Sequence, residues 1–320
     1  MKKGRLLVLA LIAVFVVGAL TGCSFNPNVR KQKYLESGLR YYQKGKYREA
    51  IIQFSNAVQV DPRFAPAHFQ LAESYAKLGI WQSAYNELQR TVDLQPGNVK
   101  AQLQLGAMLL GSHQLEQAQH RADLILKADP HSVEGHQLQA NIYAADGKMT
   151  QALQEMQQAI ALAPNRSESY LNLAALQMHA DKTVEAEAAY RKAIQLSPES
   201  VQPLLALADF YRQQKRWADS EQVLHQAINL DPKNLAPRAD LIALFLMQQK
   251  PDRAEEAATQ VKRDFPDNPE AYRALGDLYV ATGQMGKALP EFASLVAAHP
   301  KDLKTEIPKA IEKFRATFGV

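Results

Sequence analysis

The residue types that most often carry out chemistry are few in this sequence and do not fall at catalytic spacings. Cys23 is the only cysteine, so a disulfide within one chain is excluded. The eight histidines form no HExxH pair, and His131 and His136, five residues apart across a predicted helix start, are interpreted as surface or packing residues. The sequence has no GxSxG, no GxGxxG and no glycine-rich phosphate-binding loop. We therefore expect no enzyme activity, no metal, no cofactor and no small-molecule substrate.

Cys23 follows a segment that is typical of an exported protein. Lys2, Lys3 and Arg5 are basic, and residues 6–20 form a continuous apolar run. A helix of that length spans about 22 Å, short of the roughly 30 Å that a membrane span needs, so the run fits a signal peptide better. The alternative is an uncleaved single-span anchor with an incidental cysteine.

The Leu-Thr-Gly-Cys motif that ends at Cys23 resembles the lipobox of bacterial lipoproteins. The resemblance implies that residues 1–22 are removed as a signal peptide and that acylated Cys23 binds membrane lipid. Several acyl chains anchor a protein stably where one would be marginal. Because Ser24 and not an aspartate follows, we expect the outer membrane, with the chain facing the periplasm, in preference to the inner membrane. Residues 23–30 are expected to be the lipidated cysteine and a short tether.

The charge balance argues against nucleic acid as a partner. The sequence has 37 basic and 33 acidic residues, and without the three basic residues of the signal segment the counts are 34 and 33. A nearly neutral mature chain with no basic run has no electrostatic basis for binding a phosphate backbone.

The rest of the chain is a strict internal repeat. Prolines recur every 34 residues without an insertion, at positions 62, 96, 130, 164, 198, 232, 266 and 300. Most units have a small residue at one position, such as Gly38. Every unit has an alanine or serine twelve positions later, such as Ala50. Small side chains at these two positions let paired helices approach closely. Gly45, Gly79, Gly147 and Gly283 fall between the two helices, where a positive φ is often needed.

This pattern resembles the tetratricopeptide repeat (TPR) family. The resemblance implies an all-α fold: a right-handed α-solenoid of eight 34-residue helix hairpins plus a C-terminal capping helix over residues 303–320. The expected units are 31–64, 65–98, 99–132, 133–166, 167–200, 201–234, 235–268 and 269–302. The alternative for the tail is that Phe314 and Phe318 dock a partner.

Two departures predict that the last repeats are the least regular. In the seventh repeat Ile242 stands at a small position and Ala258 at a large one. In the eighth, Pro290 lies inside the second helix, where proline costs about 3 kcal/mol and should bend the helix.

In the TPR family the first helices line a concave groove, and the resemblance implies that binding residues lie there. The corresponding positions are Leu35, Leu39, Tyr42, Phe69, Leu103, Leu110, Asn141, Asn172 and Met178. The N-terminal half is apolar, which favours a protein-binding surface; the alternative is burial by curvature and the neighbouring repeat. Asn141 and Asn172 are a candidate pair for holding one peptide bond of an extended ligand. Chaperone-binding TPRs have lysines where this chain has Leu35, Phe69 and Leu103, so capture of a C-terminal carboxylate is not expected.

Residues 41–62 resemble the opening of TPR lipoproteins of exopolysaccharide export and PEP-CTERM protein-sorting systems. We therefore predict a non-catalytic, membrane-anchored scaffold that holds a protein partner of the cell envelope in its groove, as a helix or an extended peptide. The alternatives are a pilus or secretin assembly lipoprotein, a substrate-recruiting accessory subunit of an envelope enzyme, and a periplasmic holdase chaperone.

Overall fold

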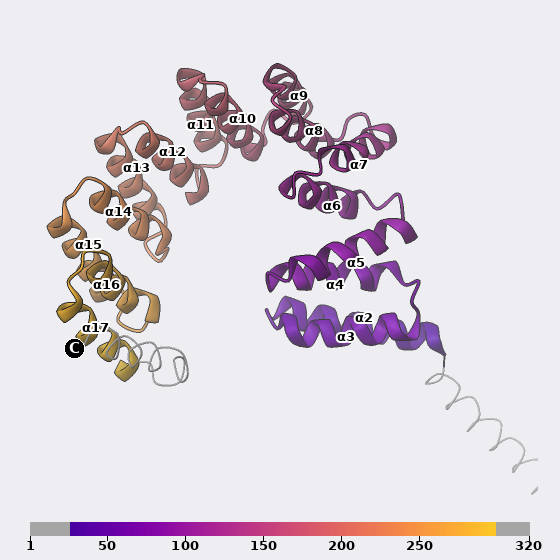
Figure 1. Ribbon diagram of the computed structural model, residues 1–320, viewed down its shortest axis with the longest axis horizontal. Coiled ribbons are helices and arrows are strands. Elements are labelled where there is room, and N and C mark those ends of the chain that lie inside the picture. Colours follow the sequence, from indigo (N-terminus) through magenta and orange to yellow (C-terminus); the bar gives the residue numbers. More distant parts are fainter. Residues whose placement is uncertain (1–25, 299–320) are drawn as a thin grey trace, which may run out of the picture. The chain divides into compact units, whose positions relative to one another are not determined.

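The computed structural model describes residues 26–298, and its regular secondary structure over that range is entirely α-helical (Figure 1). The sixteen helices of this range form eight hairpins, as the repeat predicted. Each hairpin consists of a first helix, here called the A helix, and a second, the B helix. The predicted signal peptide, Cys23 and the capping helix over 303–320 lie outside the described residues. Between residues 26 and 298, no helix combines the length and the apolar character that crossing a bilayer requires.

The chain divides into two units, and the first extends to Pro164. Its A helices are α2 (Pro27–Gln43), α4 (Ala65–Lys77), α6 (Val99–Gly111) and α8 (Val133–Ala145). Its B helices are α3 (Tyr47–Val60), α5 (Trp81–Leu94), α7 (Leu115–Ala128) and α9 (Met149–Leu162). Each helix packs mainly against the one before and the one after it, so the hairpins stack in chain order.

The second unit begins at Asn165 and repeats the same plan. Its A helices are α10 (Ser167–His179), α12 (Val201–Gln213), α14 (Ala236–Met247) and α16 (Pro269–Ala281). Its B helices are α11 (Thr183–Leu196), α13 (Trp217–Leu230), α15 (Pro251–Asp264) and α17 (Met285–Ala298).

All eight hairpin turns place one residue in the left-handed region of the backbone map. Four of them use the predicted glycines, with φ between 70° and 75°. At the same place in the other four repeats, His113, Asp181, Lys215 and Gln249 adopt φ between 57° and 61°. The turn geometry is therefore uniform along the chain, although a left-handed backbone is less favourable for a residue with a Cβ.

The first helix begins before the expected start of the first repeat. Helix α2 begins at Pro27, four residues before the predicted start of the first repeat. The side chain of Asn26 accepts a hydrogen bond from the backbone N–H of Asn28 at 2.9 Å, and proline is well suited to the first helical turn. Residues 27–30 therefore belong to the first helix.

The core lies between the paired helices, where a small residue on one meets a large residue on the other. A Cβ on Gly38 would lie 2.3 Å from Cε1 of Phe54, and one on Gly276 would lie 2.7 Å from Cε1 of Phe292. In the seventh repeat the sizes are exchanged: Ile242 and Ala258 are both buried in one cluster. Volume is conserved by this exchange, so the expected irregularity is compensated. Helix α17 likewise continues through Pro290, whose side chain is exposed.

Candidate functional site

The predicted binding residues of the first hairpin lie together along one strip of α2. Leu35, Leu39 and Tyr42 are four and three residues apart, so helical spacing places them on one side. All three are half-buried and pack around the cluster of Ala50, Phe54 and Leu71. They therefore keep part of their apolar surface accessible while fixing α2 against α3 and α4.

Two further predicted residues continue this surface on α6. Leu103 and Leu110 are half-buried and pack against the cluster that contains Leu105 and Leu109. We call the surface formed by Leu35, Leu39, Tyr42, Leu103 and Leu110 the A-helix face.

Phe69 does not belong to this exposed surface, contrary to the prediction. Its side chain is 8% exposed and is part of the buried cluster between the second and third hairpins. The ammonium group of Lys100 lies over the ring, 5.2 Å from its centroid. The neighbouring repeat covers Phe69, so it serves packing and not contact with a partner.

A polar centre on Glu73 joins three A helices beside the A-helix face. Tyr42 Oη donates to Glu73 Oε2 at 3.3 Å from α2, and Gln104 Nε2 donates to Glu73 Oε1 from α6. Lys100 Nζ lies 3.9 Å from the same Oε1. This centre was not predicted, although the sequence contains a simple signal for it: Tyr42 and Gln104 lie 31 residues before and after Glu73.

The Glu73 centre is suited to holding helices in place and not to proton transfer. Burial, and then the charge of Glu73 and its hydrogen bond, raise the pKa of Tyr42 above its usual value near 10.0. The phenol therefore stays protonated at physiological pH and acts as a fixed donor. The carboxylate is already bonded by a hydroxyl and an amide, so it is not a poised general base.

The predicted asparagine pair is divided between the two units. Asn141 is exposed on α8 of the first unit, and Asn172 is half-buried on α10 of the second. Met178, at the end of α10, packs against the buried cluster of the second unit. Each of these three is described within its own unit, and the first unit alone contains the A-helix face.

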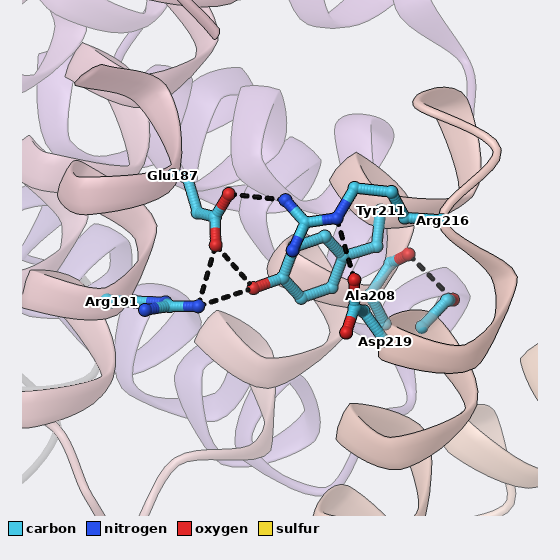
Figure 2. Close-up of polar contacts among 7 residues, drawn as sticks. Glu187, Arg191, Ala208, Tyr211, Arg216 and Asp219 are labelled. Atoms are coloured by element: carbon cyan, nitrogen blue, oxygen red, sulfur yellow. Dashed lines mark hydrogen bonds and ion pairs between the residues drawn. The ribbon is translucent and has the colours of Figure 1, made fainter. Parts of the chain in front are cut away.

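The second unit contains a polar network that was not predicted from the sequence (Figure 2). Glu187 on α11 accepts from Tyr211 Oη at 2.8 Å, from Arg191 Nη2 at 2.7 Å and from Arg216 Nη1 at 2.5 Å. The Arg216 guanidinium lies 4.3 Å from the centroid of the Tyr211 ring and also donates to Asp219. Burial opposes ionisation of Glu187, but the hydrogen bonds from Arg216 and Tyr211 outweigh it and lower the pKa of Glu187.

Related contacts recur at the next two repeat boundaries. Glu221 accepts a hydrogen bond from Arg253, whose guanidinium lies 4.1 Å from the centroid of Phe245. Glu255 accepts from Tyr279 Oη at 2.8 Å. Burial and this hydrogen bond raise the pKa of Tyr279 to about 12. The signal was visible in the sequence, since the three acceptors Glu187, Glu221 and Glu255 are each 34 residues apart.

In the first unit, polar side chains join successive repeats in a different way. Near the start of three A helices, one side chain bonds the carbonyl of the preceding repeat's proline: His68 to Pro62 at 3.1 Å, Gln102 to Pro96 at 2.9 Å and His136 to Pro130 at 3.1 Å. The interpretation of His136 as a packing residue is therefore confirmed, and His131 is exposed.

Each of these histidines also faces a carboxylate. Nδ1 of His68 lies 2.5 Å from Glu87 Oε2, and Nδ1 of His136 lies 2.7 Å from Glu155 Oε2. Since both ring nitrogens of His68 face acceptors, its surroundings suit the doubly protonated ring. Burial works against that charge, but the hydrogen bonds to Glu87 and Pro62 prevail and raise the pKa of His68.

Comparison with curated proteins finds relatives over part of the chain. DnaJ homolog subfamily C member 3 of Rattus norvegicus is 30% identical over 124 residues, which is 39% of this chain and 24% of that protein. Hsp70-Hsp90 organizing protein 3 of Arabidopsis thaliana is 26% identical over 110 residues, 34% of this chain and 20% of that protein. The chain thus spans about a quarter or less of the length of these relatives.

Among solved structures, PilW, described as a widely conserved type IV pilus biogenesis factor, superposes with a TM-score of 0.55 at 18% identity. The match covers 66% of this chain and 98% of PilW, and at that identity it supports the fold alone.

Models of tetratricopeptide repeats match nearly all of the repeat region. One, described as a TPR repeat, matches residues 38–79, and another matches 138–201. A third, described as tetratricopeptide repeat, matches 79–142, 178–245, 212–273 and 245–305. Repeats of this kind mediate protein–protein interaction and are generally non-catalytic. The chain belongs to the tetratricopeptide repeat family.

Proposed function

We propose that this chain is a non-catalytic scaffold, anchored to a membrane through acylated Cys23, that holds a protein partner of the cell envelope on the A-helix face of its first unit. The observation that carries the proposal is the strip of half-exposed apolar side chains on α2, continued by Leu103 and Leu110 on α6. An accessible apolar strip on rigid helices is the usual anchor for an amphipathic helix or an extended peptide.

The composition of the strip bears on how a partner would be recognised. The positions at which chaperone-binding repeats have lysines hold Leu35, Phe69 and Leu103 here. Binding would therefore depend on apolar side chains of the partner and not on its C-terminal carboxylate. The similarity to the DnaJ homolog and to the Hsp70-Hsp90 organizing protein does not change this expectation, because the similar segments cover about a quarter or less of those proteins.

The test replaces one anchor without removing the packing beneath it. In Leu39→Lys, the aliphatic stem can keep the contact with the core while the ammonium group reaches water. We expect normal helicity by circular dichroism and recovery of the partner, after crosslinking in intact cells and mass spectrometry, reduced about tenfold or more. The matched control is Ile52→Lys in the same hairpin, since Ile52 on α3 is 58% exposed and lies outside the A-helix face. Equal recovery with both variants would refute the assignment of the face.

The membrane anchor is tested separately. Cys23→Ser removes the only thiol, and we expect the protein to leave the membrane fraction and to lose incorporation of a labelled fatty acid. Retention of Cys23→Ser in the outer-membrane fraction after a salt wash would contradict lipid anchoring. Fractionation of the wild-type protein decides between the outer and the inner membrane.

A further inference from the structure

A solvent-accessible hollow of the first unit lies where the start of α5 meets the end of α6. It adjoins the A-helix face, since helical spacing places Ala107 of its lining on the same side of α6 as Leu103 and Leu110. It has a volume of about 710 Å³. Trp81 and Tyr85 of α5 form one wall, and Ala107, Met108 and Gly111 of α6 form the other. We call this hollow the Trp81 pocket.

The Trp81 pocket is open because the side chains that fill the same place in the second unit are replaced. Three repeats later, the counterparts of Tyr85 and Gln114 are Glu187 and Arg216, which are bonded to each other at 2.5 Å (Figure 2). At the boundary after the second repeat, Tyr85 and Gln114 themselves carry no charge and form no such bridge. Gly111 enlarges the space further, since a Cβ built on it would meet nothing within 4 Å.

The lining of the Trp81 pocket favours an uncharged, apolar ligand with hydrogen-bond acceptors. None of the described residues that line it is charged. Trp81 is 62% exposed, a large apolar area to leave in water, and Tyr85 lies one helical turn beyond it. The amide of Gln114 is already engaged, donating to Ser112 Oγ and accepting from Gln117. Across the described residues, no hydrogen bond is found for the indole N–H of Trp81, which leaves it as a donor toward a ligand.

We propose that the Trp81 pocket binds an uncharged, proline-rich segment of a partner protein in the polyproline II conformation. Such a segment has no internal hydrogen bonds, so its backbone carbonyls are free to accept from a donor such as the indole. Its proline rings pack on aromatic side chains, and little conformational entropy is lost on binding because the helix is preformed. A neutral saccharide would need several converging donors and acceptors. Among the described lining side chains, Gln82, Ser112 and Gln114 are already engaged, which leaves the Trp81 indole and the Tyr85 hydroxyl.

The experiment uses the full-length chain and its own fluorescence. The sequence has two tryptophans, so Trp217→Phe leaves Trp81 as the only tryptophan, whose emission is followed with excitation that avoids the tyrosines. The probe is a blocked peptide of Ala-Pro-Pro repeats, about twelve residues or four polyproline turns long. The comparison probes are the same peptide with its prolines replaced by glutamine, and an uncharged glucose oligosaccharide. We expect a saturable shift of Trp81 emission with the proline peptide alone.

Two variants in the same background locate the site. Gly111→Gln fills the pocket with the residue that ends α12 at the equivalent place, Gln213, and it replaces a helical glycine by a better helix former. We expect it to weaken binding about tenfold or more without loss of helicity. Ile80→Ala, which changes an exposed neighbour outside the pocket, should bind as the parent does.

Each other outcome would overturn the proposal. A response to the oligosaccharide but not to the proline peptide would assign the pocket to a saccharide. Equal binding of the proline peptide and the glutamine peptide would show that polyproline geometry is not recognised. Undiminished binding in Gly111→Gln would place the peptide elsewhere, and no response to any probe would exclude the assignment.

Discussion

Replacement of Gly38 by alanine is a sensitive test of how the first hairpin positions the A-helix face. An added Cβ would lie 2.3 Å, 2.5 Å and 2.8 Å from three atoms of the Phe54 ring. Phe54 has no exposed surface and packs with Ala50 and Leu71, so the ring cannot turn away freely. The two helices must separate or the ring must leave its preferred rotamer.

The expected magnitude follows from two opposing effects. Overpacking a closed core costs about 1–3 kcal/mol. Glycine to alanine inside a helix would otherwise gain roughly 0.5–1 kcal/mol. We therefore expect Gly38→Ala to lower the free energy of unfolding by about 0.5–2 kcal/mol, against the helix-propensity trend.

The assay is denaturant unfolding together with hydrogen exchange of α2 and α3, because repeats unfold locally and not always as one unit. Gly97→Ala is the control, since a Cβ on Gly97 meets nothing within 4 Å. The double variant Gly38→Ala, Phe54→Leu should recover part of the loss, with a coupling energy of about 0.5 kcal/mol or more. A Gly38→Ala protein that is as stable as the parent or more stable would refute the close packing of α2 on α3.

Two further predictions concern the contacts between repeats. The raised pKa of His68 means that its protonated form stabilises the fold below pH 6.5, the usual histidine value, and that this stabilisation is lost as pH rises through the raised pKa. His68→Gln, which copies Gln102 one repeat later, should remove that pH dependence from melting curves taken between about pH 5 and 8, and an unchanged dependence would contradict it. Glu187→Gln should lower the stability of the second unit by about 1 kcal/mol or less, and the loss should be smaller in 1 M salt. The control Glu185→Gln, on the same helix, should leave the stability unchanged. Equal effects of the two substitutions would show that the Glu187 network does not contribute to stability.

The fold could be predicted from sequence because its determinants are local and periodic. The proline period fixed the repeat length, and the small residues at two places of each unit indicated which helices pair closely. Ile242 and Ala258 each depart from the residue size found at the equivalent position of the other repeats, so the sequence predicted an irregular repeat. The two changes in side-chain volume compensate each other because both side chains lie in one buried cluster. A comparison of single positions between repeats does not reveal this.

The candidate site could be predicted only in part because it depends on contacts between repeats. Leu35 and Leu39 keep accessible surface, as expected, but Phe69 at the equivalent place one repeat later does not. The difference arises from the next repeat, whose Lys100 lies over the Phe69 ring. Coverage of this kind depends on side chains about 31 residues away, and a single repeat contains no information about them.

Two repeat boundaries, one in each unit, use the same position in opposite ways, and this bears on why the proposed Trp81 pocket lies in the first unit. At the boundary after the fifth repeat, Glu187 and Arg216 bridge the gap with a charged network that leaves little room for a ligand. After the second repeat, Tyr85 and Gln114 stand at these places, and the gap is a pocket of about 710 Å³. Charged side chains that pair with each other hold neighbouring hairpins together, and few of their hydrogen-bonding groups remain free for a ligand. Uncharged aromatic side chains left in water have the opposite property, because covering them with a ligand is favourable. A transplant of the bridge, Tyr85→Glu with Gln114→Arg, should therefore close the Trp81 pocket to the proline peptide while leaving capture on the A-helix face intact.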